Sequence, residues 1–156
     1  MAFSIYEGEL DCEDVRALLS QHFAEMRAGS PVSACHVLAI DELKSKDIRF
    51  FTLREDGQLL GCGALRRLEP GHGEIKSMRT ADAALGRGVG RALLDKLFKV
   101  AREEGMTRLS LETGSGEPFA AAIRLYQKTG FEQCGPFGGY KATPFTRFFT
   151  RAVPPG

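Results

Sequence analysis

Apolar residues recur with helical spacing near the start of the chain. Between Glu13 and Met26 they return every three or four positions, as one buried helix face requires; they are Val15, Leu18, Leu19, Phe23 and Met26. Asp11 can cap the start of this predicted helix, and Gly29 follows its end. A second, shorter helix is predicted from Ala39 to Lys46, with Asp41 near its start.

Strand patterns occupy the first half of the chain around these helices. Residues 3–9 predict a first strand, and the segments IRFFTLRE, QLLGCGALRRL and GEIKSMRT predict three more. Asp56-Gly57 is a strong hairpin signal between the first two of these three, and Pro70-Gly71 marks the next reversal of the chain.

The second half of the chain alternates helices with short strands. An apolar stripe from Val89 to Val100 predicts a helix that stops at Gly105, and the segment TRLSLET predicts a strand. Another helix starts near Pro118 and stops at Gly130, before two closing strands, FEQC and TRFFTRAV. This order predicts an α/β (α+β) fold, with a mixed, mostly antiparallel central sheet of about seven strands flanked by about four helices.

The composition is that of an ordinary globular protein. The 156 residues are 43% hydrophobic and 26% charged, which we interpret as a single domain spanning residues 1–156. Lys and Arg number 21 against 20 Asp and Glu, so the net charge indicates neither nucleic acid nor a membrane as a partner. No secretion signal opens the sequence and no run approaches the ~20 apolar residues of a membrane span, so we expect a cytoplasmic protein.

The cysteines and histidines give no metal-binding pattern. Cys12, Cys35, Cys62 and Cys134 lie far apart, form no CxxC pair and are expected to be reduced. Only Cys35 and His36 are adjacent, and no other spacing suits metal ligands. We therefore expect no metal.

Three glycines alternate with other residues in ALGRGVGRALL, directly before an apolar run. A glycine-rich turn at a helix start exposes unpaired N–H groups at the positive end of the helix dipole, which favours an anion such as a phosphate. Arg87 and Arg91 can add positive charge. The alternative is a flexible connection in which glycine only permits close packing. A P-loop and a dinucleotide-binding motif both fit poorly, because neither GxxxxGK[ST] nor GxGxxG is present.

Together with the strand and helix predicted after it, this segment resembles the GNAT family of acetyl-CoA-dependent N-acetyltransferases. Members carry R/Q-x-x-G-x-G/A at the helix start, which Gly88 and Gly90 match, and then A-x-x-L-Y-x-K-x-G-F one strand and one helix later. The second motif matches at Ala122, Leu125, Tyr126, Lys128, Gly130 and Phe131. The resemblance covers roughly residues 49–134. Leu85 stands where the family has Arg or Gln, and Phe119 where an asparagine is often found.

The resemblance implies a site for acetyl-CoA. Its pyrophosphate would lie on the N–H groups of the segment Arg87, Gly88, Val89, Gly90 and Arg91. Its pantetheine arm would lie along Met78, Arg79 and Thr80 in the manner of an added strand.

The resemblance also implies the catalytic groups. Tyr126 occupies the position from which family members protonate the leaving thiolate, and a main-chain N–H near Met78 would bind the oxyanion. An amine with a pKa near ~10.4 must lose a proton before it attacks. Glu74 is the candidate base, with His72, Glu112 or a water chain as alternatives.

The acceptor is predicted only as a class. We expect a small-molecule amine or amino acid, with a protein N-terminus or lysine as the alternative. Aromatic residues and the loop CGPFGGYKATPF could shape its site; the candidates are Phe51, Phe137, Tyr140, Phe145 and Phe148. A non-catalytic acyl-CoA-binding module and a nucleotide-binding regulatory domain are the rival functions. A homodimer is a candidate assembly.

Overall fold

The computed structural model describes residues 3–26, 40–142 and 144–154. Gly29, Ala39, Cys35 and His36 lie outside the described residues. The first strand, β1 (Ser4–Glu7), pairs with β2 (Ile48–Glu55), and the hairpin at Asp56-Gly57 joins β2 to β3 (Gln58–Glu69).

All seven described strands form one sheet in the order β1-β2-β3-β4-β5-β7-β6. The remaining strands are β4 (His72–Thr80), β5 (Arg108–Gly114), β6 (Glu132–Cys134) and β7 (Thr146–Ala152). Every neighbouring pair is antiparallel except β4 and β5, which are parallel. The predicted mixed, mostly antiparallel sheet of seven strands is confirmed.

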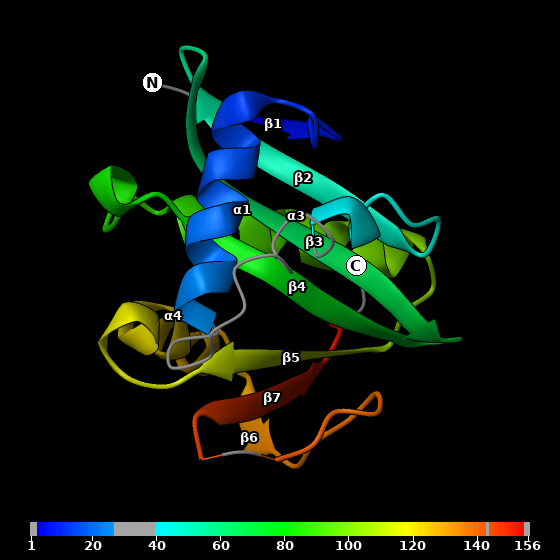
Figure 1. Cartoon of the computed structure of the whole chain (residues 1–156). Coiled ribbons are helices and arrows are strands. Elements are labelled where there is room, and N and C mark those ends of the chain that lie inside the picture. The colour runs from blue at the N-terminus through cyan, green and yellow to red at the C-terminus, as the bar shows by residue number, and fades with distance from the viewer. Residues whose placement is uncertain (1–2, 27–39, 143, 155–156) are drawn as a thin grey trace.

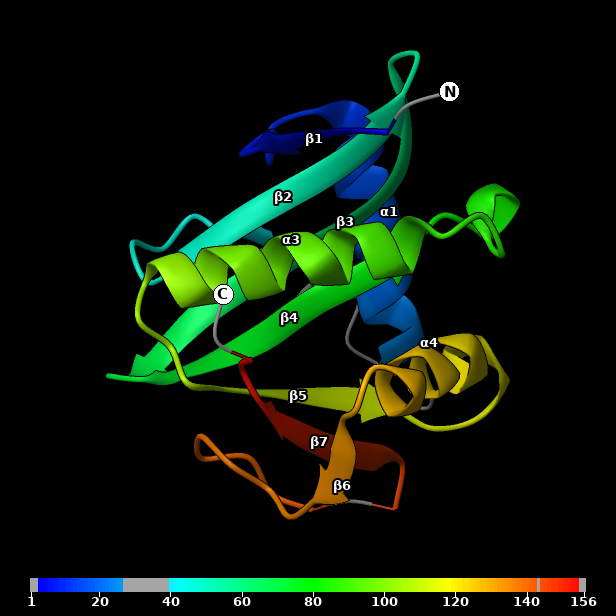
Figure 2. The same ribbon diagram turned by 180° about the vertical axis from the view of Figure 1, so that it is seen from behind.

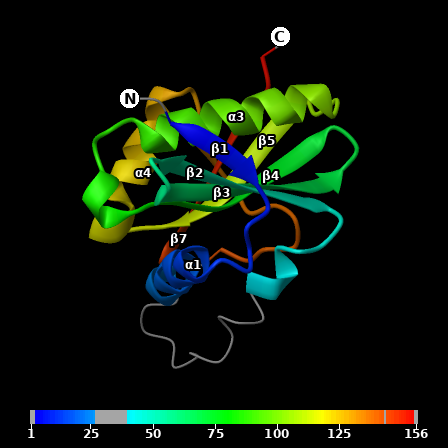
Figure 3. The same cartoon turned by 90° about the horizontal axis from the view of Figure 1, so that it is seen from above.

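Helices cover both faces of this sheet (Figures 1 and 2). Helix α1 (Glu13–Met26) lies on one face, while α3 (Val89–Glu103) and α4 (Glu117–Lys128) lie on the other; the view from above separates these layers (Figure 3). Of the predicted helix ending at Lys46, residues 40–42 are helical and turns follow up to residue 47. The 3-10 helix η1 (Asp82–Ala84), which the sequence pattern did not indicate, precedes the glycine segment.

Alternation along the strands produces a core on each face. Phe51 and Leu53 of β2 belong to the core under α3, together with the fully buried Leu93, Leu94 and Leu97 of that helix. Phe50, next in the chain to Phe51, belongs to the core under α1. Each buried side chain of this size stabilises the fold by about 1.5–3 kcal/mol relative to exposure. The two cores therefore fix α1 and α3 on opposite sides of the central strands.

The centre of the sheet opens between β4 and β5. The two strands pair only from His72 with Arg108 to Ile75 with Leu111, and beyond this point they diverge (Figure 1). In the same region β4 contains a bulge, because the register with β3 passes from Ala64–Lys76 to Cys62–Arg79. Ser77 lies at the bulge with φ of 54°, an uncommon conformation for a residue with a side chain. Beyond Ile75, β4 is thus a free strand edge, and the start of α3 and helix α4 lie beside it.

Candidate functional site

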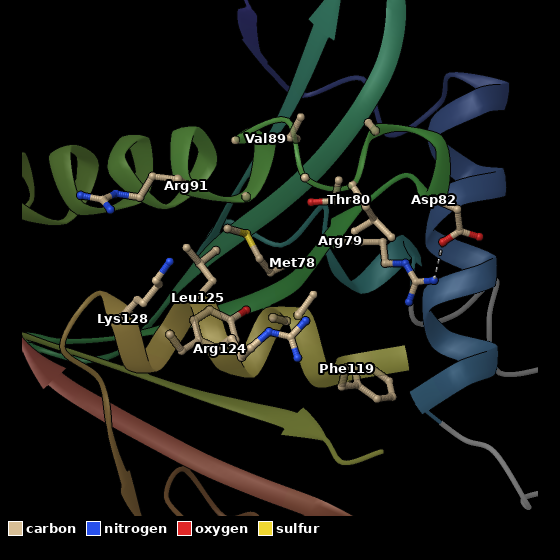
Figure 4. Close-up of a pocket in the computed structure, with 18 of the residues that line it drawn as sticks. Met78, Arg79, Thr80, Asp82, Val89, Arg91, Phe119, Arg124, Leu125 and Lys128 are labelled. Carbon is tan, nitrogen blue, oxygen red and sulfur yellow. Dashed lines mark ion pairs between the residues drawn. The ribbon is translucent and has the colours of Figure 1, made fainter. Parts of the chain in front are cut away.

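A first cavity of about 420 Å³ lies between the end of β4, the start of α3 and α4 (Figure 4). It brings together most of the predicted cofactor site and the predicted acid. The predicted residues that line it are Met78, Arg79, Thr80, Gly88, Val89, Gly90, Arg91 and Tyr126.

The start of α3 offers unpaired N–H groups to this cavity. Gly88 caps the helix in the left-handed conformation, with φ of 84°, and supplies no side-chain hydrogen bond. The first helical hydrogen bond runs from the N–H of Ala92 to the carbonyl of Gly88 at 3.0 Å. The N–H groups of Val89, Gly90 and Arg91 therefore have no partner within the helix and carry its positive dipole end.

Gly90 satisfies the packing interpretation of the glycine segment as well. A Cβ at this position would come within 2.9 Å of Leu125 Cδ2 on α4. The missing side chain lets α3 and α4 approach each other beside the cavity. Gly88 thus fits the anion-binding interpretation because it exposes the start of α3, and Gly90 fits the packing interpretation.

Cationic side chains surround the same cavity. Arg124 and Lys128, four residues apart on α4, line it together with Arg91, which pairs with Asp95 at 3.3 Å (Figure 4). No predicted site included Arg124, although its spacing from Lys128 places both on one helix face. Positive charge on α4 adds to the attraction of the α3 N-terminus for an anion.

Two of the expected arginines have guanidinium groups that are already paired with carboxylates. Arg87 pairs with Glu55 at 2.6 Å and lies over the Phe3 ring, and it is absent from the cavity lining. Arg79 lines the cavity, but its guanidinium pairs with Glu25 of α1 at 2.6 Å and lies 3.6 Å from Asp82 (Figure 4). The expected charge of Arg87 at the rim is therefore engaged by Glu55.

Tyr126 is packed and also reaches the cavity. Its side chain is 3% exposed and its ring contacts those of Phe131 and Phe149. Burial raises the pKa of the Tyr126 hydroxyl, so the hydroxyl stays protonated at neutral pH. A protonated hydroxyl that faces a cavity can donate a proton.

A second cavity of about 500 Å³ lies on the α1 face of the sheet and contains Glu74. This side chain is only 3% exposed. Its Oε2 accepts a hydrogen bond from the Tyr140 hydroxyl at 2.6 Å, while Oε1 is buried without a hydrogen-bond partner in the described part of the chain. A buried carboxylate oxygen without a donor is costly, which favours a ligand or water there.

Tyr140 brings the predicted loop into the second cavity. Its ring contacts those of Phe137 and Phe148, and burial together with the Glu74 hydrogen bond raises the pKa of its hydroxyl. The other aromatic candidates lie apart from this cavity: Phe51 is in the core under α3, and Phe145 packs on Phe119. Of the five aromatic candidates, only Tyr140 lines it.

The two alternative bases occupy different positions. His72 bonds Ser110 Oγ at 2.7 Å and lines neither cavity. Glu112 does line the second cavity, where burial and the neighbouring Glu74 raise its pKa. Glu112 therefore holds a proton more readily than an exposed carboxylate does, while His72 is held in a hydrogen-bond network.

His22 of α1 is the residue that the sequence patterns missed at this site. It lines both cavities, is buried, and its Nδ1 has no hydrogen-bond partner among the described residues. Burial lowers its pKa to about 4, and the nearby positive charge of Arg79 acts in the same direction. His22 is therefore neutral at physiological pH.

The described residues hold neither a membrane-spanning helix nor a metal-binding cluster. In the ranges 3–26, 40–142 and 144–154, no helix has the length and apolarity needed to cross a membrane. Within those same ranges, no three His, Cys, Asp or Glu side chains are grouped to hold a metal ion.

Comparison with known proteins identifies the family. Residues 13–131 match the Acetyltransferase (GNAT) family. The chain therefore belongs to this family, whose members use acetyl-CoA, and it is an acetyltransferase.

Two curated relatives match over nearly their whole length. YsnE of Bacillus subtilis (strain 168), an uncharacterized N-acetyltransferase, is 39% identical over 93% of this chain and 96% of its own. YedL of Escherichia coli (strain K12), likewise an uncharacterized N-acetyltransferase, is 40% identical over 95% of this chain and 93% of its own. A solved structure from Klebsiella pneumoniae, described as an acyl-CoA N-acyltransferase, superposes with a TM-score of 0.79 at 25% identity, covering 97% of both chains.

The depressed pKa of His22 predicts a loss of stability in acid. Its pKa is 6.5 in the unfolded chain and about 4 in the fold, so the unfolded state binds more protons between these values. Stability falls as the pH drops through this window, by up to about 3 kcal/mol from His22 alone. Urea unfolding of wild type and His22→Gln at pH 7 and pH 4.5 measures the free energy of unfolding at both pH values. His22→Gln should lose less stability than wild type between pH 7 and pH 4.5. An equal loss in both proteins would contradict the assignment to His22.

Proposed function

We propose that the protein moves the acetyl group of acetyl-CoA to a primary amine of a small molecule or amino acid by direct attack. One observation carries the proposal: consecutive parts of β4 line two cavities that share His22. Tyr126 stands in the first cavity, and the unpartnered carboxylate oxygen of Glu74 belongs to the second. A proton donor and a proton acceptor thus flank the place where β4 and β5 diverge.

Acetyl-CoA, when bound, supplies an acetyl thioester. The N–H groups from Arg87 to Arg91 would hold its pyrophosphate, with the positive charges of Arg124 and Lys128 beside them. Met78, Arg79 and Thr80 would offer main-chain groups to the pantetheine arm. This assignment is supported by the free edge of β4, since pairing with β5 ends at Ile75.

Tyr126 is the proposed acid. As the bond between the carbonyl carbon and sulfur breaks, its hydroxyl donates a proton to the departing thiolate. A free thiol has a pKa near ~8.5, so the thiolate is a weak enough base to leave with this assistance. The position of Tyr126 in the lining of the first cavity supports the role. Its raised pKa keeps the hydroxyl protonated but also makes it a weaker acid, so the tyrosinate must regain a proton as soon as the thiolate leaves.

Glu74 is the proposed base. It accepts a proton from the attacking amine, directly or through a chain of water molecules. Tyr140 supports this role by holding Oε2, which leaves Oε1 for a donor from the cavity. The bulge at Ser77 supports the N–H of Met78 as the donor to the oxygen of the attacked carbonyl.

Other functions remain as alternatives with their own tests. A protein N-terminus or lysine could serve as acceptor, and a non-catalytic module would bind acetyl-CoA without turnover. Release of free CoA thiol in the presence of amines separates an enzyme from such a module. The single domain, the cytoplasmic location and the homodimer stay predictions from the sequence.

Replacing Tyr126 by Phe should lower kcat by about 10²–10⁴-fold, since a general acid contributes on this scale. The acetyl-CoA Kd should stay nearly unchanged, because the ring and its packing are kept. Initial rates and calorimetric titration measure the two quantities. Tyr6→Phe, an exposed tyrosine on β1, is the matched control. A variant with wild-type kcat removes Tyr126 from the role of acid.

Glu74→Gln should abolish the acidic limb of the pH dependence of kcat/KM. The carboxylate must be ionised to accept a proton, so the wild-type rate falls at low pH, whereas an amide does not titrate. The matched control is Glu103→Gln on the exposed side of α3. If Glu74→Gln keeps both the height and the shape of the wild-type profile, the base lies elsewhere.

A further inference from the structure

The second cavity presents charges of both signs on one face of the sheet. Arg66 of β3 lies directly opposite Glu74 of β4 in the strand register. Lys76 lies two residues along β4, and Glu112 comes from β5. All four line the cavity together with Glu42, so an acceptor entering it meets two cations and three carboxyl groups.

Arg66 lines this cavity, and its guanidinium has N–H groups that can bind a new partner. Its Nη1 is 3.8 Å from Glu74 Oε1, too far for a hydrogen bond, and this is its single ion pair in the described part of the chain. The side chain is 43% exposed. By contrast, Arg54 and Arg79 have carboxylates at 2.7 and 2.6 Å. Lys76 is engaged with the Tyr140 hydroxyl at 3.2 Å.

The pair Arg66 and Glu74 therefore presents adjacent opposite charges that do not satisfy each other. An α-amino acid carries the complementary pair, with one carbon between its amine and its carboxylate. The guanidinium fork matches a carboxylate in two parallel hydrogen bonds. A diamine lacks the anion, and a protein N-terminus lacks a carboxylate next to its amine.

We infer that the acceptor is a free α-amino acid, whose carboxylate is bound by Arg66 while its amine lies against Glu74. The inference rests on the proposed function, because it takes the second cavity as the acceptor site. Glu74 precedes the bulge at Ser77 by three residues on the same strand, and both residues line the second cavity. Arg66 lines this cavity from β3, so the carboxylate of the amino acid would lie on the β3 side.

The test compares α-amino acids with their α-carboxamides, which keep the amine and remove the negative charge. Release of CoA thiol gives kcat/KM for both series with wild type, Arg66→Gln and Arg66→Lys. Wild type should prefer the acids. Arg66→Gln should lower kcat/KM for the acids on the order of 10- to 100-fold, mainly through KM, with little change for the amides. Arg66→Lys should restore part of the loss.

Arg102→Gln is the matched control, since Arg102 is an exposed arginine on the last turn of α3. Thermal melts verify that the variants are folded. Equal rates of wild type with acids and amides, or an equal loss for both series in Arg66→Gln, overturn the inference while leaving the proposed function intact.

A binding measurement distinguishes a failure of the proposed acetyl transfer from a failure of the role assigned to Arg66. Calorimetric titration of the same amino acids into CoA-saturated protein reports binding without turnover. If no amine is acetylated, the proposed function fails. In that case, binding of the acids to wild type and its loss in Arg66→Gln still support the assignment of Arg66, and equal binding to both proteins contradicts it.

Discussion

The end of pairing between β4 and β5 is the constraint on which the site depends. The two parallel strands share hydrogen bonds only as far as Ile75 and Leu111, although both continue. The core under α3 contains residues of β2, β3, β4, β5 and β7, so it holds the strands on both sides of the opening and the opening is built into the fold. It gives β4 a free edge in the middle of a seven-stranded sheet, where a ligand can supply the missing partner.

The charged groups and helix ends around the opening determine what it can bind. The dipole of α3 and the cations of α4 act at one end of the free edge, where a phosphate group would be held. His22 borders both cavities and stays neutral, so it adds no charge of its own between the two sites. The charge beside it is that of Arg79, which is paired with Glu25 of α1.

Much of the architecture was predictable because it depends on local patterns. Alternation and turn residues predicted β2 with its observed bounds, and the apolar stripe after Gly88 predicted α3. The two family motifs predicted that Tyr126 and the N-terminus of α3 belong to one site, and both line the first cavity. Their spacing along the chain reflects the order of elements, which sequence patterns record well.

The features that the sequence did not predict depend instead on contacts between distant segments. The hydrogen bond between Tyr140 and Glu74 joins residues 66 positions apart, and nothing in either local pattern indicates it. The bulge at Ser77 is missed because a serine does not indicate a positive φ. Arg87 was expected beside a ligand, yet the fold places Glu55 within 2.6 Å of it. Only the assembled sheet determines which charges are free.

A crystal structure of the protein with bound acetyl-CoA would show directly whether the opening in the sheet is the cofactor site. We expect phosphate oxygens within hydrogen-bond distance of the N–H groups of Val89, Gly90 and Arg91. We also expect the sulfur beside the Tyr126 hydroxyl, at the divergence of β4 and β5. A thioester bound away from this opening, with no contact to Tyr126, would contradict both the site and the proposed chemistry.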